Sequence, residues 1–384
     1  MDLDLDLLSK ARRSVRNLPT YDAGISIDRF SSSDNPRVIH NLSVNENPFG
    51  MSPRAITALQ MAVQTGAIYP DGDCFYLREK LGEKLGVGPE RIIAGNGSED
   101  ILSLICKVFI NVGDKVLIPK PTFSLHHIYA AMMDAEVIEV PIDSALNFNA
   151  TRWLETLRSL HQLKILMLAN PSNPVGCSLT HTELSLMVNA CPSDTLLVID
   201  EAYVEYAAHE PEFPRVFEIL QNQERPWIVL RTFSKAYGLA GMRVGYGICS
   251  HGTITNLLNR VRTPYNVNRL AQIAAIQSLD DQQHLAKTVQ FTVREKDRMR
   301  DEILSWGIAV APSSTNFLFI DIEAPSIKVA NYLLSQNVMV KAWRGVGYES
   351  FIRVSIGHQY QNELLLRNLK HYLSEQMLNF PVAL

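Results

Sequence analysis

Lys235 lies among residue types that could bind an aldehyde cofactor and its phosphate. The run 231–243 reads Arg-Thr-Phe-Ser-Lys-Ala-Tyr-Gly-Leu-Ala-Gly-Met-Arg, and an apolar run upstream of it ends in Asp200. A lysine amine can join covalently to an aldehyde, and a carboxylate can pair with a protonated pyridine nitrogen. Hydroxyls and a two-pronged guanidinium suit a phosphate dianion. The pattern predicts a pyridoxal 5'-phosphate (PLP) site, with Thr232, Ser234 and Arg243 around the phosphate.

Two further loops and one ring suit the same ligand. The run 95–99, Gly-Asn-Gly-Ser-Glu, opens a predicted helix, where backbone amides bind anions. The run 170–176 carries two prolines that would present Asn173 rigidly to a phenolate oxygen. Phe123 could stack on a flat heterocycle. Simpler readings remain open: ordinary turns, a core phenylalanine, and Asp200 as a helix cap or metal ligand.

The order of predicted elements indicates how these residues are brought together. Continuous apolar runs at 165–169, 195–199 and 227–230 lie between helical segments, which is typical of a parallel sheet covered on both faces. Ligands bind such sheets outside the carboxyl ends of the strands, where the loops described above fall. We therefore predict an α/β fold with a mostly parallel central sheet, helices on both faces and a smaller α+β domain.

The pattern changes along the chain in a way that predicts domain limits. After about residue 255, long helical segments at roughly 268–280 and 283–306 precede two short strand runs. We expect an N-terminal arm and part of the small domain at 1–46, a large PLP-binding domain at 47–255, and a small C-terminal α+β domain at 256–384.

The composition excludes several classes of protein. The 384 residues are 46% hydrophobic and 20% charged, with 36 basic and 40 acidic side chains and a net charge of −4. With no long basic run, nothing indicates a nucleic-acid partner. The five cysteines are scattered without C-x-x-C spacing, which favours reduced thiols over a metal site. The acidic N-terminus is unlike a signal peptide and no apolar run is long enough for a membrane span, so we expect a cytoplasmic protein.

Taken together, these runs resemble fold-type I PLP-dependent enzymes, the aspartate-aminotransferase superfamily, and within it the histidinol-phosphate aminotransferase family. The likeness covers nearly the whole chain. The lysine run and Asp200 are typical of the superfamily, whereas the segments around Tyr21, 45–48 and 266–268 point to the narrower family. The matching segments are 15–21, 45–48, 69–72, 95–99, 121–124, 200–205, 231–245, 266–268 and 353–357.

The resemblance implies a role for each matching cofactor residue. Lys235 would hold the cofactor covalently and shuttle a proton, while Asp200 would pair with its ring nitrogen. Asn173 and Tyr203 would contact the ring oxygen, and Phe123 would stack on the ring. The remaining cofactor-binding residues would be Gly97, Ser98, Glu99, Thr232, Ser234 and Arg243, with Tyr69 reaching the phosphate from the other subunit of a homodimer.

The resemblance also implies substrate contacts, with two departures from the family pattern. Arg353 would bind the α-carboxylate of the amino-acid partner, Tyr21 and Lys341 would hold the phosphate of histidinol phosphate, and Asn47 would bind substrate. Val175 stands where the family usually has threonine, and Lys341 where it usually has arginine. A lysine keeps the charge but loses the two-pronged grip on phosphate.

The implied activity is amino transfer between L-histidinol phosphate and 2-oxoglutarate in histidine biosynthesis. Two rivals share the fold: an aromatic amino-acid aminotransferase and a phosphothreonine-type decarboxylase. A third reading is a PLP-binding regulator without catalysis. Such regulators usually carry a DNA-binding module, and no basic helix-turn-helix pattern precedes residue 50.

Overall fold

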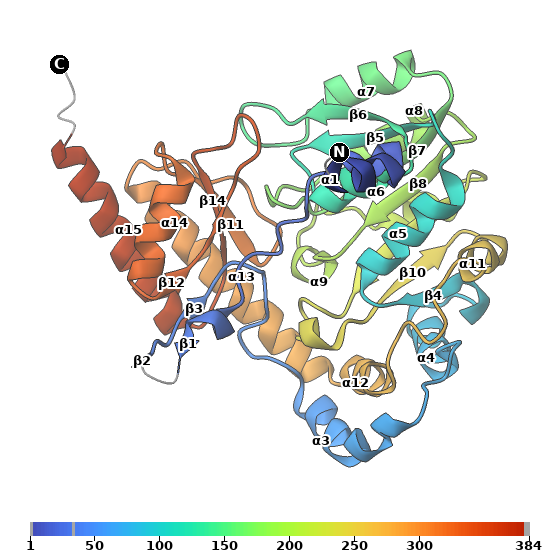
Figure 1. Ribbon diagram of the computed structural model, residues 1–384, viewed down its shortest axis with the longest axis horizontal. Helices are drawn as coiled ribbons and strands as arrows, with labels where there is room; N and C mark the ends of the chain where they lie inside the picture. The colour runs from blue at the N-terminus through green and yellow to red at the C-terminus, as the bar shows by residue number, and fades with distance from the viewer. Residues whose placement is uncertain (1–2, 33–34, 380–384) are drawn as a thin grey trace.

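The computed structural model describes residues 3–32 and 35–379, and its centre is a seven-stranded sheet (Figure 1). Along the sheet the strands follow the order β4-β10-β9-β8-β7-β5-β6. Neighbouring strands are parallel except for β10, which runs antiparallel to both β4 and β9. The predicted mostly parallel sheet is therefore confirmed. The strands are β4 (Ile92–Gly95), β5 (Lys115–Lys120), β6 (Glu136–Pro141), β7 (Leu163–Ala169), β8 (Leu196–Asp200), β9 (Trp227–Thr232) and β10 (Gly245–Cys249).

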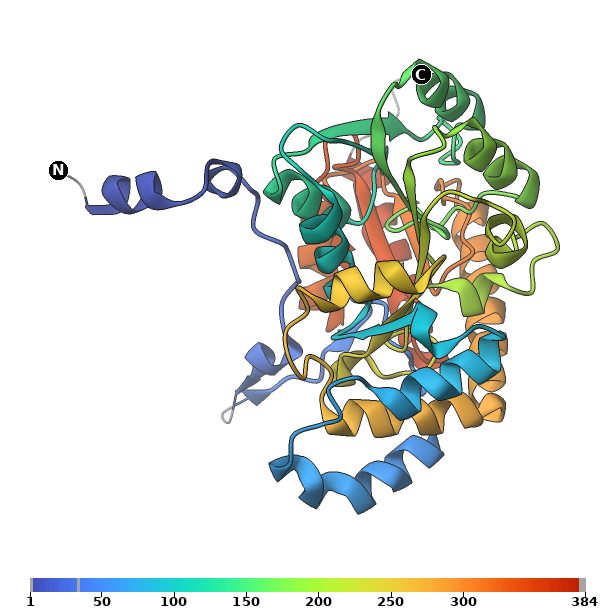
Figure 2. The same ribbon diagram turned by 90° about the vertical axis from the view of Figure 1, so that its right-hand side faces the viewer.

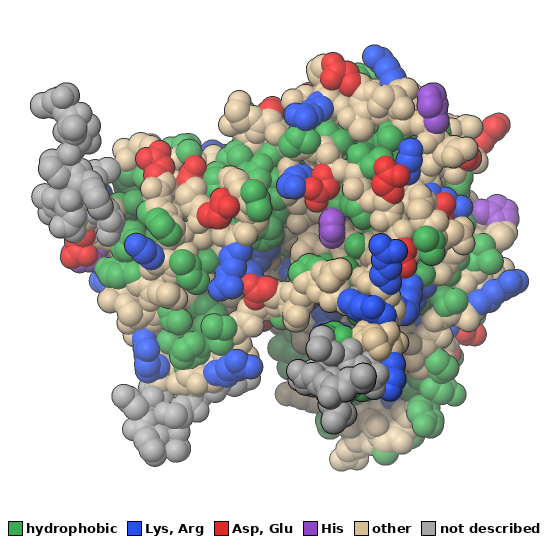
Figure 3. Space-filling view, turned by 45° about the horizontal axis from the view of Figure 1, so that its top comes forward, with side chains coloured by type: hydrophobic (Ala, Val, Ile, Leu, Met, Phe, Trp, Pro, Cys, Tyr) green, Lys and Arg blue, Asp and Glu red, His purple; other side chains and the backbone are tan. Residues whose placement is uncertain are grey.

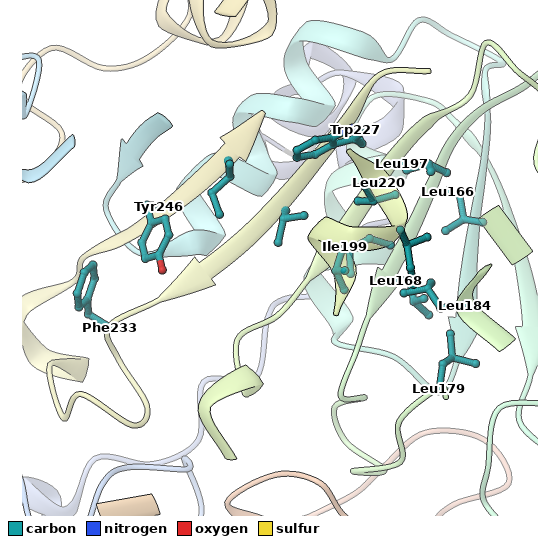
Figure 4. Packing of buried hydrophobic residues seen from close by; sticks show 14 of the residues in the cluster. Leu166, Leu168, Leu179, Leu184, Leu197, Ile199, Leu220, Trp227, Phe233 and Tyr246 are labelled. Carbon is teal, nitrogen blue, oxygen red and sulfur yellow. The ribbon is translucent and has the colours of Figure 1, made fainter. Parts of the chain in front are cut away.

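Side chains alternate along each strand between two cores, as the pleat of a strand requires. In β8, for example, Leu197 and Ile199 belong to one buried cluster, and Leu196 and Val198 to the other. Figure 4 shows the first cluster, with Trp227, Leu197 and Leu166 gathered beside the strands. Because both faces are buried, the strands read as continuous apolar runs in the sequence.

Helices cover both faces (Figures 1 and 2). One face carries α5 (Ser98–Phe109), α6 (Ser124–Met132) and α11 (Gly252–Asn259). The other carries α4 (Phe75–Leu85), α7 (Ala150–Ser159), α8 (His181–Ala190), α10 (Val216–Leu220) and α12 (Arg269–Asp280). The helix α3 (Pro53–Ala62) packs on α12, and the Ser52 side chain caps it by accepting from the Ala55 amide. The short elements η2 (Val63–Ala67) and α9 (Val204–Ala207) complete this part of the chain.

A smaller unit lies beside the large sheet. Its antiparallel sheet has the order β11 (Phe317–Asp321), β14 (Phe351–Ser355) and β13 (Lys341–Ala342). The N-terminal strand β3 (His40–Asn41) pairs in parallel with β12 (Val338–Met339), so the arm and the C-terminal part meet here. Its helices are α13 (Gln282–Ser305), α14 (Ser326–Ser335) and α15 (Gln359–Asn379). The domain limits at 46 and 255 stay predictions.

The N-terminal arm begins with two short helices. It forms α1 (Leu3–Lys10) and α2 (Arg13–Arg16), because Arg12 between them is extended with ψ 139°. Short helices are marginal without packing partners, and Figure 2 shows α1 extending away from the rest of the chain. After it come η1 (Ile27–Phe30) and the strand pair β1 (Ser31–Ser32) and β2 (Asn35–Pro36).

The surface carries both signs of charge. Basic and acidic side chains are interspersed on the face shown in Figure 3. Over 3–32 and 35–379, no helix combines the length and apolar character needed to cross a membrane. All five cysteines are buried and none is in a disulfide.

Candidate active site

A cavity of about 740 Å³ lies where the carboxyl ends of the large strands meet the N-terminal segment and the small sheet. It brings together side chains from residue 21 to residue 353. Every predicted site residue except Asn47 and Tyr69 lines it. These residues are Tyr21, Gly97, Ser98, Glu99, Phe123, Asn173, Asp200, Tyr203, Thr232, Ser234, Lys235, Arg243, Lys341 and Arg353.

Lys235 is half-buried in the cavity wall. Its Nζ donates to the carbonyl oxygen of Val44 at 3.1 Å and lies 6.0 Å from the centre of the Tyr203 ring. Burial, reinforced by the positive charge of Arg353, lowers the pKa of Lys235 to about 8. The amine is therefore uncharged more often than an exposed lysine, as a nucleophile or a base must be.

The turn after β9 that carries Lys235 depends on one glycine. Gly238 has φ +69°, and a Cβ there would lie 2.0 Å from the Gly50 carbonyl oxygen. Another residue would force the two loops apart. A Cβ at Gly241, farther along the same run, would meet no atom within 4 Å, so the turn does not depend on this second glycine.

Asp200 ends β8 as a nearly buried carboxylate. Its Oδ1 accepts from the Ala202 amide at 3.1 Å, and its Oδ2 lies 3.5 Å from Nε2 of His126. That histidine is fully buried, and its Nδ1 lies 3.1 Å from Thr122 Oγ1. Its Nε2 has no hydrogen-bond partner among the described residues. A buried carboxylate with so few donors suits a positively charged partner such as a pyridinium N–H.

The residues predicted at the phosphate form a compact cradle. Ser98 begins α5, where amides point out of the helix, and Thr232 Oγ1 donates to Ser234 Oγ at 3.0 Å. The Nη2 of Arg243 lies 3.6 Å from Oε2 of Glu99. Helix-start amides, hydroxyls and a guanidinium suit a phosphate dianion. Glu99 adds a negative charge at the edge of the cradle, where its Oε1 accepts from the Tyr129 hydroxyl at 2.7 Å.

The cradle requires glycine at two close approaches. A Cβ on Gly97, which has φ +83°, would lie 2.6 Å from Arg243 Nη2. A Cβ on Gly245 would lie 2.3 Å from the Ser98 amide nitrogen. These two glycines let β10 and the start of α5 approach each other, so that the anion-binding amides and the guanidinium face the same space.

Tyr203 and Asn173 occupy the wall where a ring oxygen would be bound. The Tyr203 hydroxyl accepts from Asn45 Nδ2 at 2.9 Å, and burial raises the pKa of Tyr203 to about 12. Oδ1 of Asn173 accepts from Arg353 Nη1 at 2.6 Å, so this amide can donate to a ligand only through its NH2 group. Both side chains are therefore donors at neutral pH.

The substrate side of the cavity is rich in cations. Arg353 on β14 is nearly buried, and its Nη2 donates to the Ser43 carbonyl oxygen at 2.9 Å. Its Nε has no partner among the described residues. Lys341 lies opposite Arg353 in the β13–β14 register. Tyr21 reaches in from the N-terminal segment, edge-on to Phe123 with the ring centres 6.1 Å apart.

Asn47 and Tyr69 lie outside this cavity. The amide of Asn47 donates to the Ala236 carbonyl oxygen at 2.9 Å and so supports the turn after Lys235. Tyr69 is 75% exposed and stacks on Tyr265 with the ring centres 4.7 Å apart. Its predicted role was across a subunit interface, which a single chain does not test. Both roles stay predictions.

Several cavity or near-cavity residues were missed from the sequence, among them Asp22, Val44, Asn45 and His126. Asn45 belongs to the 45–48 run that the resemblance singled out, so a signal was present there. The other three carry no local signal, because their contacts depend on segments far apart in the chain.

The family model for aminotransferase class I and II matches residues 37–369. The chain belongs to this aminotransferase family. A histidinol-phosphate aminotransferase of Mesorhizobium japonicum is 40% identical over 370 residues, covering 95% of this chain and 100% of the relative. One of Rhizobium meliloti is 38% identical over 359 residues, covering 94% and 96%.

A solved structure agrees with these relatives. Histidinol-phosphate aminotransferase from Sinorhizobium meliloti in complex with pyridoxal-5'-phosphate matches with a TM-score of 0.85 and 25% identity, over 96% of this chain and 98% of that one. The predicted family, the fold type and the assignment as an aminotransferase are confirmed.

Proposed function

We propose that this aminotransferase moves the amino group of L-histidinol phosphate to 2-oxoglutarate, with PLP as cofactor, in histidine biosynthesis. The observation that carries the proposal is a single cavity holding Lys235, the buried Asp200, a phosphate cradle and a separate group of substrate-side cations. The near full-length identity to histidinol-phosphate aminotransferases supports it.

The residues of the cavity fit PLP. When bound, the cofactor supplies an aldehyde for amine exchange and a ring that stabilises negative charge on the adjacent carbon. Asp200 would hold the protonated ring nitrogen, beside Nε2 of His126, which has no hydrogen-bond partner in the described part of the chain. The Nζ of Lys235 would take the proton from the carbon that bears the substrate amine and deliver it to the aldehyde carbon of the cofactor, on the other side of the nitrogen. The residues around Ser98 and Arg243 would anchor the phosphate.

Substrate anions would bind at the opposite group of cations. Arg353 offers a buried guanidinium to a carboxylate, and the ammonium of Lys341 and the hydroxyl of Tyr21 offer donors to a phosphate. Both proposed substrates carry such groups, because 2-oxoglutarate has two carboxylates and histidinol phosphate has one phosphate ester.

Replacement of Lys235 tests the assignment of the cofactor lysine. Lys235→Ala is expected to lower turnover by about 10³-fold or more, because the same amine serves as attachment point and base. It should also abolish the absorbance of the covalently held cofactor. Activity assays and absorption spectra of the purified variant check this. A variant with full activity would refute the assignment.

A panel of amino donors tests the substrate. With 2-oxoglutarate as acceptor, histidinol phosphate should be used more efficiently than phenylalanine or tyrosine. Equal or better use of the aromatic amino acids would favour an aromatic amino-acid aminotransferase. Release of carbon dioxide without any oxo-acid acceptor would indicate a decarboxylase.

We further propose that the enzyme is a cytoplasmic homodimer with shared active sites. Apolar side chains are exposed along α3, η2 and α4, among them Met61 at 82% and Tyr76 at 73%. An exposed apolar surface of this kind indicates a protein partner. Tyr69 lies on the same stretch, where a second copy would bring it to the neighbouring phosphate cradle. The five buried cysteines, none of them in a disulfide, support the cytoplasm.

A further inference from the structure

Asp22 connects the N-terminal segment to the small sheet at the cavity. Its Oδ2 accepts from Lys341 Nζ at 2.8 Å, and its backbone oxygen accepts from the same ammonium at 3.0 Å. Asp22 is itself held, because its Oδ1 accepts from the Gly24 amide at 2.9 Å. The hydrogen bond from Lys341 lowers the pKa of Asp22, so the carboxylate is charged at neutral pH.

This contact joins the N-terminal segment that carries Tyr21 to the strand that carries Lys341, the two residues predicted to hold the substrate phosphate. Tyr21 immediately precedes Asp22, and Lys341 lies directly opposite Arg353 in an antiparallel pair. Directly opposed residues of such a pair project from the same face of the sheet. Tyr21, Lys341 and Arg353 all line the cavity, so Asp22 holds the first of these beside the other two.

An ammonium on a flexible stem needs this support more than a guanidinium would. Lysine has three N–H donors on a four-carbon chain, and ordering such a chain on binding costs affinity. Asp22 accepts two of the three donors and leaves one for a substrate oxygen. The Lys341 side chain is only 17% exposed, whereas the Asp22 side chain is 57% exposed, so the aspartate approaches the lysine from the solvent side.

We propose that Asp22 is a positioning residue that directs Lys341 at the phosphate of the amino donor and thereby raises the preference for phosphorylated donors. The inference rests on the proposed function, since it concerns the phosphate of that substrate. It assigns the selectivity of the site to a residue outside the group that contacts the cofactor.

Kinetics of Asp22 variants test the role. In Asp22→Ala, the KM for histidinol phosphate should rise about three- to tenfold, the range expected for ordering one flexible side chain, with a smaller change in kcat. The KM for phenylalanine should not change, because that donor has no phosphate. Asp22→Asn, which keeps an acceptor oxygen, should fall between Asp22→Ala and the wild type. In a Lys341→Met background, Asp22→Ala should add nothing.

Inorganic phosphate provides a second measurement that does not depend on the donor. Its inhibition constant, measured against whichever donor the wild type uses, should rise in Asp22→Ala. A lower or unchanged inhibition constant would overturn the proposal, since Asp22 would then either compete with phosphate for Lys341 or have no effect on phosphate binding. Failure of the wild type to use histidinol phosphate would instead count against the proposed function alone. Asp301→Ala, which removes an exposed ion-paired aspartate from α13, is the matched control and should behave as wild type.

Discussion

At the scale of single residues, the cavity disfavours the charged form of the Lys235 amine. Among the described residues, the Lys235 amine donates one hydrogen bond, to the Val44 carbonyl oxygen, and the positive charge of Arg353 disfavours its protonated form. Its pKa of about 8 lies below the ordinary 10.5, so the folded chain binds the Lys235 proton less tightly than the unfolded chain does. The reactivity of the amine is therefore obtained at the expense of stability, as is common at functional sites.

This loss of stability should be measurable in the cofactor-free protein. Below pH 8 both the folded and the unfolded chains hold the Lys235 proton, and the full penalty of the buried charge applies. Between pH 8 and 10.5 only the unfolded chain holds this proton. As pH rises through this range, the free energy of unfolding of the wild type therefore increases relative to that of a variant without the amine.

Lys235→Met should accordingly be more stable than wild type at pH 7 by roughly 2 kcal/mol, less than the full value of the shift because the side chain of Lys235 is only half-buried. The difference should shrink at pH 9.5. Urea unfolding of both cofactor-free proteins at the two pH values measures it. A variant that is less stable at pH 7 would show that the ammonium is not penalised by burial.

At the scale of elements, the phosphate cradle depends on how closely β10 approaches the start of α5. Gly245 faces the Ser98 amide, and that approach leaves no room for a methyl group. The helix cannot move alone, since Ile101 and Leu104 on α5 belong to the buried core beneath it. The geometry of anion binding is therefore set by the packing of a strand against a helix.

Gly245→Ala should push the first turn of α5 away from the cradle. Strain of this kind typically costs about 1–3 kcal/mol, so we expect roughly tenfold weaker PLP binding. Titration of cofactor-free protein with PLP, followed by absorbance, gives the dissociation constant. Gly241→Ala, whose added methyl group would have no atom within 4 Å, is the control and should bind as wild type does. Equal affinity in both variants would contradict the argument.

At the scale of the whole molecule, two features each carry more than one exposed apolar side chain: the helix α1, which extends away from the rest of the chain, and the stretch over α3, η2 and α4 (Figure 2). Leu7 and Leu8 on α1 are both more than half exposed. A second copy of the chain would cover such surfaces, and it would bring Tyr69 to the phosphate cradle of its neighbour.

The proposed dimer should have twice the 43.1 kDa mass of the chain, about 86 kDa. Met61→Glu should shift it toward monomer and lower activity, because a buried unpaired charge opposes association. Size-exclusion chromatography with light scattering gives the mass. Val112→Glu changes a residue that is 80% exposed on the loop after α5 and should remain dimeric. A wild-type monomer with full activity would exclude shared active sites.

The sequence alone determined the cofactor chemistry and the large sheet. Lys235, Asp200 and the loops after β4, β7 and β9 are marked by local patterns, and parallel strands place their carboxyl ends at one edge. The helices α7, α11 and α14 were not predicted, although each is amphipathic and α7 and α14 are as long as α8, which was predicted.

Only the tertiary structure decided the contacts between distant segments. Asp22 reaches Lys341, Asn45 reaches Tyr203, and His126 reaches Asp200. None of these pairs has a local pattern, because each depends on how whole elements pack together. Local periodicity reports which face of one element is buried, whereas the partner across the cavity is selected by the packing of the entire chain.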